Sequence, residues 1–332
     1  MNIISETLQT SRLGQPQVCE RLTVVPIVNF IDSEPEYITL ETALKTKVAR
    51  FREKSSATVP EILFQNSGKT SVLLLDGEEL IGAKQNRVLN MTILAPAKSK
   101  LTIPVSCVER GRWDAGSPDF SSADNLMFWT VRMQKTSAVS RNLATDGTRA
   151  SNQLEVWNTL QRTQSALHVS SATGAMRDIF KHQQRQIARY LKGFTLATNT
   201  TGAVFFIDER PVGVELFDHP ATFSKVFPKL IRSYALETFL KPNSIAKVDF
   251  SCPSDAAQQL LDQTSRCAVK YYPAIGEGTD IRLHDLTLVG AALKAKNRLV
   301  HLCAFLGKLP KRIGARPKSS RAPILLGHYA ST

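Results

Sequence analysis

Two neighbouring segments of the first half of the chain, residues 86–95 and 101–109, alternate with the period of a β-strand. In both, the odd-numbered residues are apolar except the one farthest from the connecting residues 96–100, which is Arg87 in the first segment and Glu109 in the second. Because alternate residues of a strand share a face, each segment has one apolar face that ends in a charge. The pattern predicts a hairpin whose register is fixed by burial of the two apolar faces.

In that register Leu89 faces Cys107 and Arg87 faces Glu109, with opposed Cβ atoms about 5 Å apart. A partly buried pair of this kind is costly to desolvate, so it can mark a pocket as well as a structural bridge. Two interpretations stay open: an ion pair that closes the end of a barrel, and the inner edge of a binding site. Pro104 lies within the second segment and lacks an N–H group, which predicts a sheet edge or a bulge.

Polar residues gather at the same end of the predicted hairpin. On one side are Glu78, Glu79, Lys84, Gln85 and Asn86, and on the other are Ser106, Arg110, Arg112 and Trp113. Arginines bind phosphate oxygens through their forked guanidinium group, and a tryptophan ring can stack on a base. Glutamates suit Mg²⁺ or general-base chemistry. The residues therefore predict a site for a phosphorylated small molecule, with Mg²⁺ as a cofactor that these donors allow.

The remaining patterns predict an α+β fold. Residues 20–113 are strand-rich and should form antiparallel hairpins, whereas residues 151–306 contain helices and further strands. Between them, the polar residues 114–150 predict a long irregular loop. We expect both halves to share one core in a single domain over residues 1–306, followed by a basic, flexible tail at residues 307–332.

Charge and composition limit the possible partners and the location. The net charge is +13, and most of its excess lies after Asp285, where no acidic residue occurs. The basic run between Lys308 and Arg321 predicts weak nucleic-acid contact without sequence preference. The cations from Arg177 to Arg189 are more typical of a solvated helix face than of a nucleic-acid surface. Without a secretory signal or a membrane-spanning apolar run, we expect a cytoplasmic protein that does not enter a membrane.

Three blocks of the sequence resemble one bacterial family, named for its association with ADP-ribosylglycohydrolases and rhodanese-phosphatases. The blocks are residues 73–90 (LLLDGEELIGAKQNRVLN), 103–113 (IPVSCVERGRW) and 217–236 (FDHPATFSKVFPKLIRSYAL), and the likeness extends over residues 22–305. It implies a strand-rich α+β fold and a role in ADP-ribose or nucleotide chemistry, in the setting of bacterial conflict systems.

The resemblance also assigns roles to individual residues. It implies catalytic roles for Glu78, Glu79 and Glu109, and ligand binding by Gln85, Asn86, Arg87, Arg110, Arg112, Trp113, Arg232 and Ser233. Three functions stay open: a hydrolase of ADP-ribose or nucleotide derivatives, a non-catalytic nucleotide sensor, and an assembly protein whose polar loops form the interface of a homo-oligomer.

Overall fold

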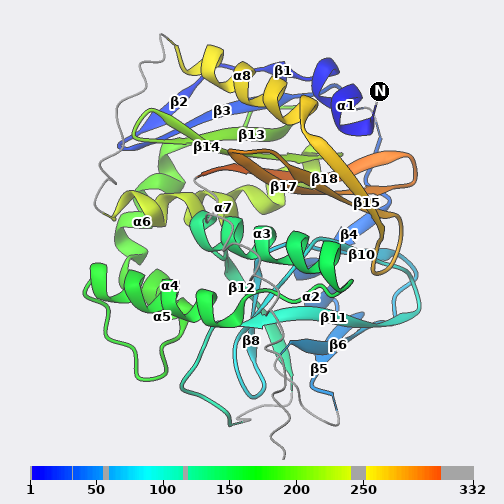
Figure 1. Cartoon of the computed structure of the whole chain (residues 1–332), viewed down its shortest axis with the longest axis vertical. Coiled ribbons are helices and arrows are strands. Elements are labelled where there is room, and N and C mark those ends of the chain that lie inside the picture. The colour runs from blue at the N-terminus through cyan, green and yellow to red at the C-terminus, as the bar shows by residue number, and fades with distance from the viewer. Residues whose placement is uncertain (1, 32, 55–59, 115–118, 241–251, 308–332) are drawn as a thin grey trace, which may run out of the picture.

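The computed structural model describes residues 2–31, 33–54, 60–114, 119–240 and 252–307. Its elements form an upper and a lower lobe stacked along the long axis of the molecule, with helices between and beside the sheets (Figure 1). Antiparallel sheets dominate the N-terminal half and helices enter in the second half, so the predicted α+β class is confirmed. Of the predicted basic tail at residues 307–332, residues 308–332 lie outside the described residues.

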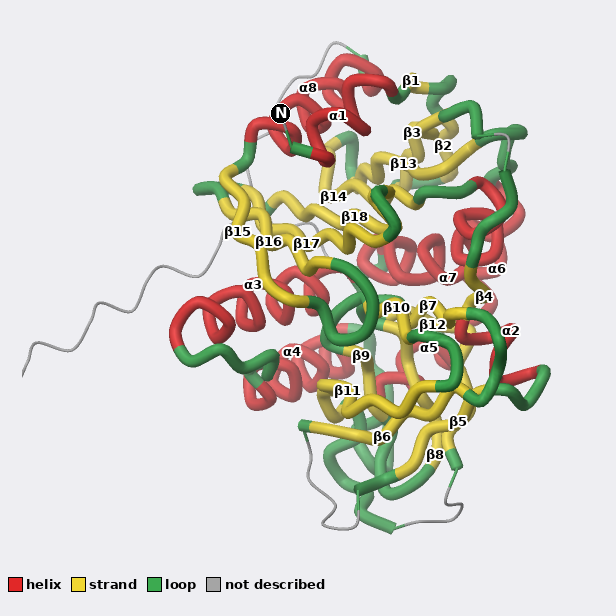
Figure 2. The backbone as a smooth tube through the Cα atoms, turned by 90° about the vertical axis from the view of Figure 1, so that its right-hand side faces the viewer, coloured by secondary structure: helices red, strands yellow, loops and turns green. Residues whose placement is uncertain are grey.

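The upper lobe contains a nine-stranded sheet in the order β1-β3-β13-β14-β18-β17-β16-β15, with β2 also paired to β3. The strands are β1 (Arg12–Leu13), β2 (Gln17–Cys19), β3 (Leu22–Val28), β13 (Thr200–Ile207), β14 (Arg210–Phe217), β15 (Ala268–Pro273), β16 (Thr279–His284), β17 (Leu288–Ala295) and β18 (Arg298–Leu306). Helices α1 (Ile3–Thr10) and α8 (Pro253–Arg266) cover one face, and α7 (Pro220–Thr238) and α3 (Trp129–Thr145) lie on the other (Figure 2).

The lower lobe combines a six-stranded sheet, in the order β12-β8-β9-β11-β6-β5, with a three-stranded sheet in the order β10-β7-β4. The strands are β4 (Tyr37–Thr39), β5 (Ala49–Arg52), β6 (Glu61–Asn66), β7 (Ser71–Leu74), β8 (Glu78–Gly82), β9 (Arg87–Leu89), β10 (Ile93–Ala95), β11 (Ser99–Cys107) and β12 (Phe120–Leu126). The remaining helices are α2 (Leu40–Lys45), α4 (Gln153–Ala166), α5 (Met176–His182) and α6 (Gln184–Gly193).

Buried apolar side chains connect the two lobes. Strand β13 is apolar on both faces because helices cover both: Phe206 packs in the cluster that contains α1 and α8, and Phe205 packs in the cluster that contains α7. The second cluster also includes Leu73 and Leu94 of the lower lobe. The expected shared core is thus present, since one apolar cluster includes residues of both lobes.

The predicted hairpin forms only in part, and its register is wrong by two residues. Strand β9 does pair with β11, but Leu89 faces Val105 and Arg87 faces Cys107. Residues 93–95 pair with β7 instead, and the first part of β11 pairs with β6 up to Pro104. Pro104 lies where the pairing of β11 changes from β6 to β9. Its missing N–H group therefore does not interrupt a continuous series of hydrogen bonds.

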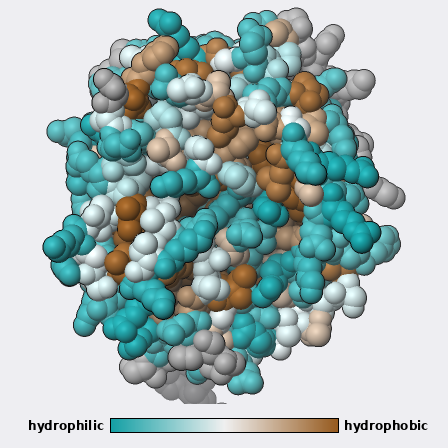
Figure 3. All heavy atoms as spheres, turned by 180° about the vertical axis from the view of Figure 1, so that it is seen from behind, coloured by the Kyte–Doolittle hydropathy of each residue, from teal (hydrophilic) through white to brown (hydrophobic). Residues whose placement is uncertain are grey.

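The segment 114–150, predicted to be one long irregular loop, contains strand β12 and the 17-residue helix α3. Helix α3 was missed because it buries charged side chains, Arg132 and Lys135, where an amphipathic helix would bury apolar ones. No helix among the described residues is both long enough and apolar enough to cross a bilayer. On the face shown in Figure 3, hydrophobic residues occur in groups among hydrophilic ones.

Candidate functional site

Several of the predicted residues do meet at the lower end of the β8–β9 hairpin. We call Lys84, Asn86, Glu109, Arg112, Trp113 and Thr173 the rim cluster. Glu109 follows β11, and its backbone forms an isolated bridge with Ala175. The Glu109 carboxylate accepts hydrogen bonds from Arg112 Nε (2.9 Å) and Nη2 (2.7 Å), from Thr173 Oγ1 (2.8 Å) and from the Asn86 amide (3.1 Å).

These contacts fix the ionisation state of Glu109. Burial alone would raise its pKa, but the hydrogen bonds from Arg112, Thr173 and Asn86 together hold the pKa below its usual range. Glu109 is therefore an ionised carboxylate surrounded by donors. Such a group anchors an arginine well, and it is a poor general base.

Arg112 in turn holds the hairpin turn in place. Its guanidinium donates to the carbonyl oxygens of Ala83 (2.5 Å) and Asp114 (3.0 Å) and to Asn86 Oδ1 (3.1 Å). Bonds to both sides of one turn, added to the ion pair with Glu109, order the loop that carries Lys84 and Gln85.

Trp113 gives the rim cluster its accessible surface. Its side chain is 48% exposed. Lys84 Nζ lies 5.1 Å from the ring centroid and the guanidinium carbon of Arg87 lies 5.8 Å from it. Close by in sequence, exposed Arg110 stacks over Trp157 at 5.3 Å. The cluster thus presents an aromatic face beside several cations.

The predicted ion pair between Arg87 and Glu109 is not formed. Arg87 is fully buried and lies 3.6 Å from Glu53 Oε1, whereas Glu109 pairs with Arg112. The shifted register places Cys107 opposite Arg87, and Glu109 lies beyond the end of the strand. Burial lowers the pKa of Arg87, and Glu53 acts in the opposite direction. The predicted pairing of Arg87 with Glu109 at the inner edge of a pocket is therefore wrong. The predicted residues Asn86, Glu109 and Arg112 do come together.

The other two predicted glutamates lie elsewhere on β8. Glu78 forms a buried ion pair with Lys229 of α7 (2.7 Å) and accepts a hydrogen bond from Ser122 Oγ (3.2 Å). On the same helix Ser233 donates to the Met127 carbonyl (2.9 Å), and Arg232 is half-buried. These contacts tie α7 to the lower sheet, so the structure does not bring Glu78, Arg232 and Ser233 into the rim cluster.

Glu79 points to the opposite side of β8 and is fully buried. Within the described part of the chain, neither of its carboxylate oxygens has a hydrogen-bond partner of acceptable geometry. Burial raises its pKa to about 8, while Asn125 and Arg177 lower it and the charge of Glu109 raises it. Glu79 is therefore protonated at neutral pH. Gln85 is also buried, and its Oε1 atom likewise has no partner among the described residues.

A third group, which sequence reasoning missed, is fully buried between the sheets. We call Asp76, Arg132, Lys135, Glu215 and His301 the central network. Arg132 of α3 lies 2.6 Å from Glu215 Oε1 and 3.3 Å from Asp76 Oδ2, and Lys135 also pairs with Asp76. His301 Nε2 lies 3.2 Å from Glu215 Oε2. The network joins α3 to both lobes.

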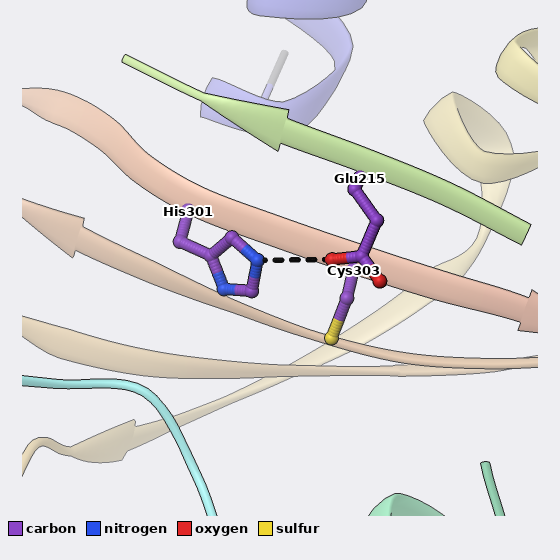
Figure 4. A group of neighbouring side chains, drawn as sticks. All are labelled: Glu215, His301 and Cys303. Carbon is purple, nitrogen blue, oxygen red and sulfur yellow. Dashed lines mark hydrogen bonds and ion pairs between the residues drawn. The ribbon is translucent and has the colours of Figure 1, made fainter. Parts of the chain in front are cut away.

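Figure 4 shows three members of this region that resemble a metal-ligand set, Glu215, His301 and Cys303, whose donor atoms lie within 4.8 Å of one another. Glu215 is already bound by Arg132, however, and it also accepts from the Tyr234 hydroxyl (3.2 Å). Burial raises the pKa of the Cys303 thiol, which disfavours the thiolate that metals require. An ion-pair network explains these residues better than a metal centre.

A hollow of about 670 Å³ opens beside the first turn of α7, and none of the predicted site residues lines it. Its polar lining includes Glu34, Asn199, His219 and Ser224. His219 Nδ1 accepts from the Ala221 amide (3.1 Å) and its Nε2 donates to the Ser33 carbonyl, which fixes one neutral tautomer. Burial also lowers the pKa of His219, which favours this neutral form.

Comparison with known families matches residues 10–305 to a family described as the ARG and Rhodanese-Phosphatase-superfamily-associated Protein domain. This match includes all three blocks on which the resemblance was based. Searches of curated proteins and of solved structures found no match.

Proposed function

The chain belongs to the family of ARG and Rhodanese-Phosphatase-superfamily-associated Protein domains, and on that premise we propose that its rim cluster binds a phosphorylated, nucleotide-like small molecule related to ADP-ribose. The observation that carries the proposal is the half-exposed ring of Trp113 with Lys84 beside it and exposed Arg110 three residues earlier in the chain. A ring open to solvent can stack on a base, and neighbouring cations attract phosphate.

The cations of this region divide into two kinds. Arg112 is committed to Glu109, Asn86 and backbone carbonyls, so its main contribution is to hold the loop. Lys84 and Arg110 form no ion pair among the described residues, so their charge is available to a ligand. Phosphate would therefore contact Lys84 and Arg110, while Trp113 takes the base.

Hydrolysis of such a molecule is the second candidate function, and Glu79 is the observation that favours it. A carboxylic acid that keeps its proton at neutral pH is in the state that a general acid needs. The raised pKa of Glu79, its burial and its proximity to the charge of Glu109 fit that role. Glu109 itself is ionised and already bonded to several donors, so binding has more support than catalysis.

Thermal-shift and calorimetric titrations test the binding proposal. We would titrate the protein with ADP-ribose, ADP, AMP and ribose 5-phosphate, each with and without Mg²⁺. At least one compound should raise the melting temperature, and Trp113→Ala should weaken its binding at least tenfold. Tyr271→Ala is the matched control, because Tyr271 is a similarly exposed aromatic residue on β15. Failure of every compound, or equal binding by Trp113→Ala, would overturn the proposal.

Product analysis on the same mixtures separates the three candidate functions. A hydrolase should release product that Glu79→Gln abolishes while binding persists. A sensor should be stabilised without product. An assembly role predicts instead that Trp113→Ala changes the oligomeric state measured by light scattering and that no nucleotide alters the melting temperature.

A further inference from the structure

Helices α5 and α6 carry a row of exposed cations that the proposed small-molecule site does not use. The exposed residues are Arg177, Lys181, Arg185, Arg189 and Lys192. We call these five residues the α5–α6 stripe. Figure 1 shows α4, α5 and α6 along the same side of the molecule.

Helical geometry places the cations of α6 in a single line. With 3.6 residues per turn, Arg185, Arg189 and Lys192 lie within about 60° of one another around the helix axis and extend over roughly 10 Å. The buried residues Ile187 and Tyr190 occupy the other side. The three cations of α6 therefore face solvent along one basic edge, and exposed Arg177 and Lys181 precede them on α5.

The stripe gathers five exposed cations on two consecutive helices. Some exposed or half-exposed cations elsewhere have carboxylate partners, as in Arg21–Asp208, Lys45–Glu41 and Lys296–Glu36, and others, such as Lys69, Lys100 and Lys270, are scattered over strands and turns. None of the five stripe residues forms an ion pair with a described residue. Asp178 is the acidic residue within α5, and it accepts a hydrogen bond from Ser171. Unbalanced positive charge of this kind attracts polyanions.

The stripe begins beside the rim cluster. The Gly111 amide donates to the Thr173 carbonyl and the Met176 amide donates to the Val108 carbonyl, each at 2.8 Å. The loop before α5 thus runs alongside the residues that carry Arg110 and Trp113, and Arg177 follows at the first turn of α5. Accessible aromatic surface and a basic track are therefore adjacent.

We propose that the α5–α6 stripe binds the phosphate backbone of a single-stranded nucleic acid whose terminal nucleotide stacks on Trp113. This inference rests on the proposed function, because it identifies the nucleotide-like ligand as the end of a longer strand. Proteins that bind single strands commonly combine a basic track with aromatic stacking in this way. Five phosphate contacts predict that the logarithm of the binding constant falls with the logarithm of salt concentration with a slope of about −3.5.

Fluorescence anisotropy with a labelled single strand of about 12 nucleotides, as RNA and as DNA, measures the binding constant and its dependence on salt. The triple variant Arg185→Gln, Arg189→Gln, Lys192→Gln should bind at least tenfold more weakly than wild type in low salt. Its salt slope should be smaller in magnitude by about 2, because three contacts are removed. The control variant Lys69→Gln, Lys100→Gln, Lys270→Gln removes the same charge from exposed positions on strands and turns and should bind like wild type.

Two further comparisons separate this inference from the small-molecule proposal. The stripe variant should retain wild-type affinity for the free nucleotide, whereas Trp113→Ala should lose both ligands. If the stripe variant binds single strands as the control does, the inference is wrong and the small-molecule proposal stands. If single strands bind through the stripe but Trp113→Ala has no effect, the terminal nucleotide does not lie on Trp113 and the inference is also wrong.

The identity of the polyanion is tested with the same variants. A duplex of equal length and vesicles of anionic phospholipid should bind more weakly than the single strand. Binding of either one through the stripe, with affinity equal to or above that of the single strand, would overturn the choice of a single-stranded partner.

Discussion

The side chain of Arg132 lies directly against the Cα of Gly77: a Cβ atom on this glycine would stand 2.9 Å from both Cδ and Nε of the arginine. Gly77 also has a φ of +78°, a conformation that residues with side chains rarely adopt. The Asp76-Gly77 pair therefore does more than form a turn. It lets the central network reach Asp76 from α3.

Gly77→Ala should destabilise the fold more than a comparable glycine change elsewhere. The new methyl group must displace the Arg132 side chain, which is held by Asp76 and Glu215. Gly147→Ala is the control, because Gly147 has a similar φ of +75° but nothing lies within 4 Å of a new Cβ. We expect about 1 kcal/mol for the control and at least twice that for Gly77→Ala in urea unfolding. Equal losses would show that Arg132 moves aside at no cost.

Arg132→Met should cost about 3–5 kcal/mol, because it leaves the buried carboxylates of Asp76 and Glu215 without their shared partner. The measurement is the free energy of unfolding in urea. Adding Glu215→Gln to this variant should restore part of the loss, since the uncompensated charge is then removed. Lys45→Met, which breaks an exposed pair with Glu41, should change stability little. A fully stable Arg132→Met variant would contradict the structural role of the network.

The β-strands of the proposed hairpin could be predicted from sequence because alternation is a local property. The break between β9 and β10 could not. It depends on distant side chains: Lys135 Nζ donates to the Asn90 carbonyl (3.0 Å) and Thr92 Oγ1 accepts from the Asp76 amide (3.2 Å). The first contact occupies the Asn90 carbonyl that a continuous hairpin could have paired, the second holds the Thr92 side chain against the Asp76 backbone, and residues 93–95 pair with β7.

The candidate site likewise combines local features that the sequence predicts with distant contacts that it does not. The meeting of Asn86, Glu109 and Arg112 could be predicted, since all three lie at the end of two adjacent strands. The partner Thr173 could not, because it arrives from a loop before α5. Burial of Arg132 and Lys135 is equally invisible in the sequence, where a charged residue indicates an exposed position unless its partners are known.

Glu79→Gln should remove a pH dependence from the stability of the protein. The pKa of this carboxyl rises from 4.5 to about 8 on folding, so the folded state keeps a proton that the unfolded chain releases above about pH 4.5. Stability should therefore fall between pH 4.5 and 8, by a total on the order of a few kcal/mol, and then level off. The free energy of unfolding should be measured in urea at pH 5, 7 and 9. The stability of the variant relative to that of wild type should increase as pH rises.

The control for this prediction is Glu6→Gln, which changes an exposed glutamate in the first turn of α1 and should leave the pH profile as in wild type. If Glu79→Gln and wild type have parallel profiles, Glu79 does not hold a proton in the folded state. The proposed role as a general acid would then lose its support.

Glu109 and Arg112 should act as one unit in a double-mutant cycle. Each of Glu109→Gln and Arg112→Gln removes the ion pair at 2.7 Å, so the double variant should cost less than the sum of the single changes. Because a quarter of the Arg112 side chain is exposed, solvent screening should keep the coupling near 1 kcal/mol. Arg112→Gln combined with Asp208→Asn, whose partner is Arg21, should be additive. Additive losses in the Glu109–Arg112 cycle as well would mean that the loop carrying Lys84 and Trp113 is not held by this pair, and ligand affinity should then survive both changes.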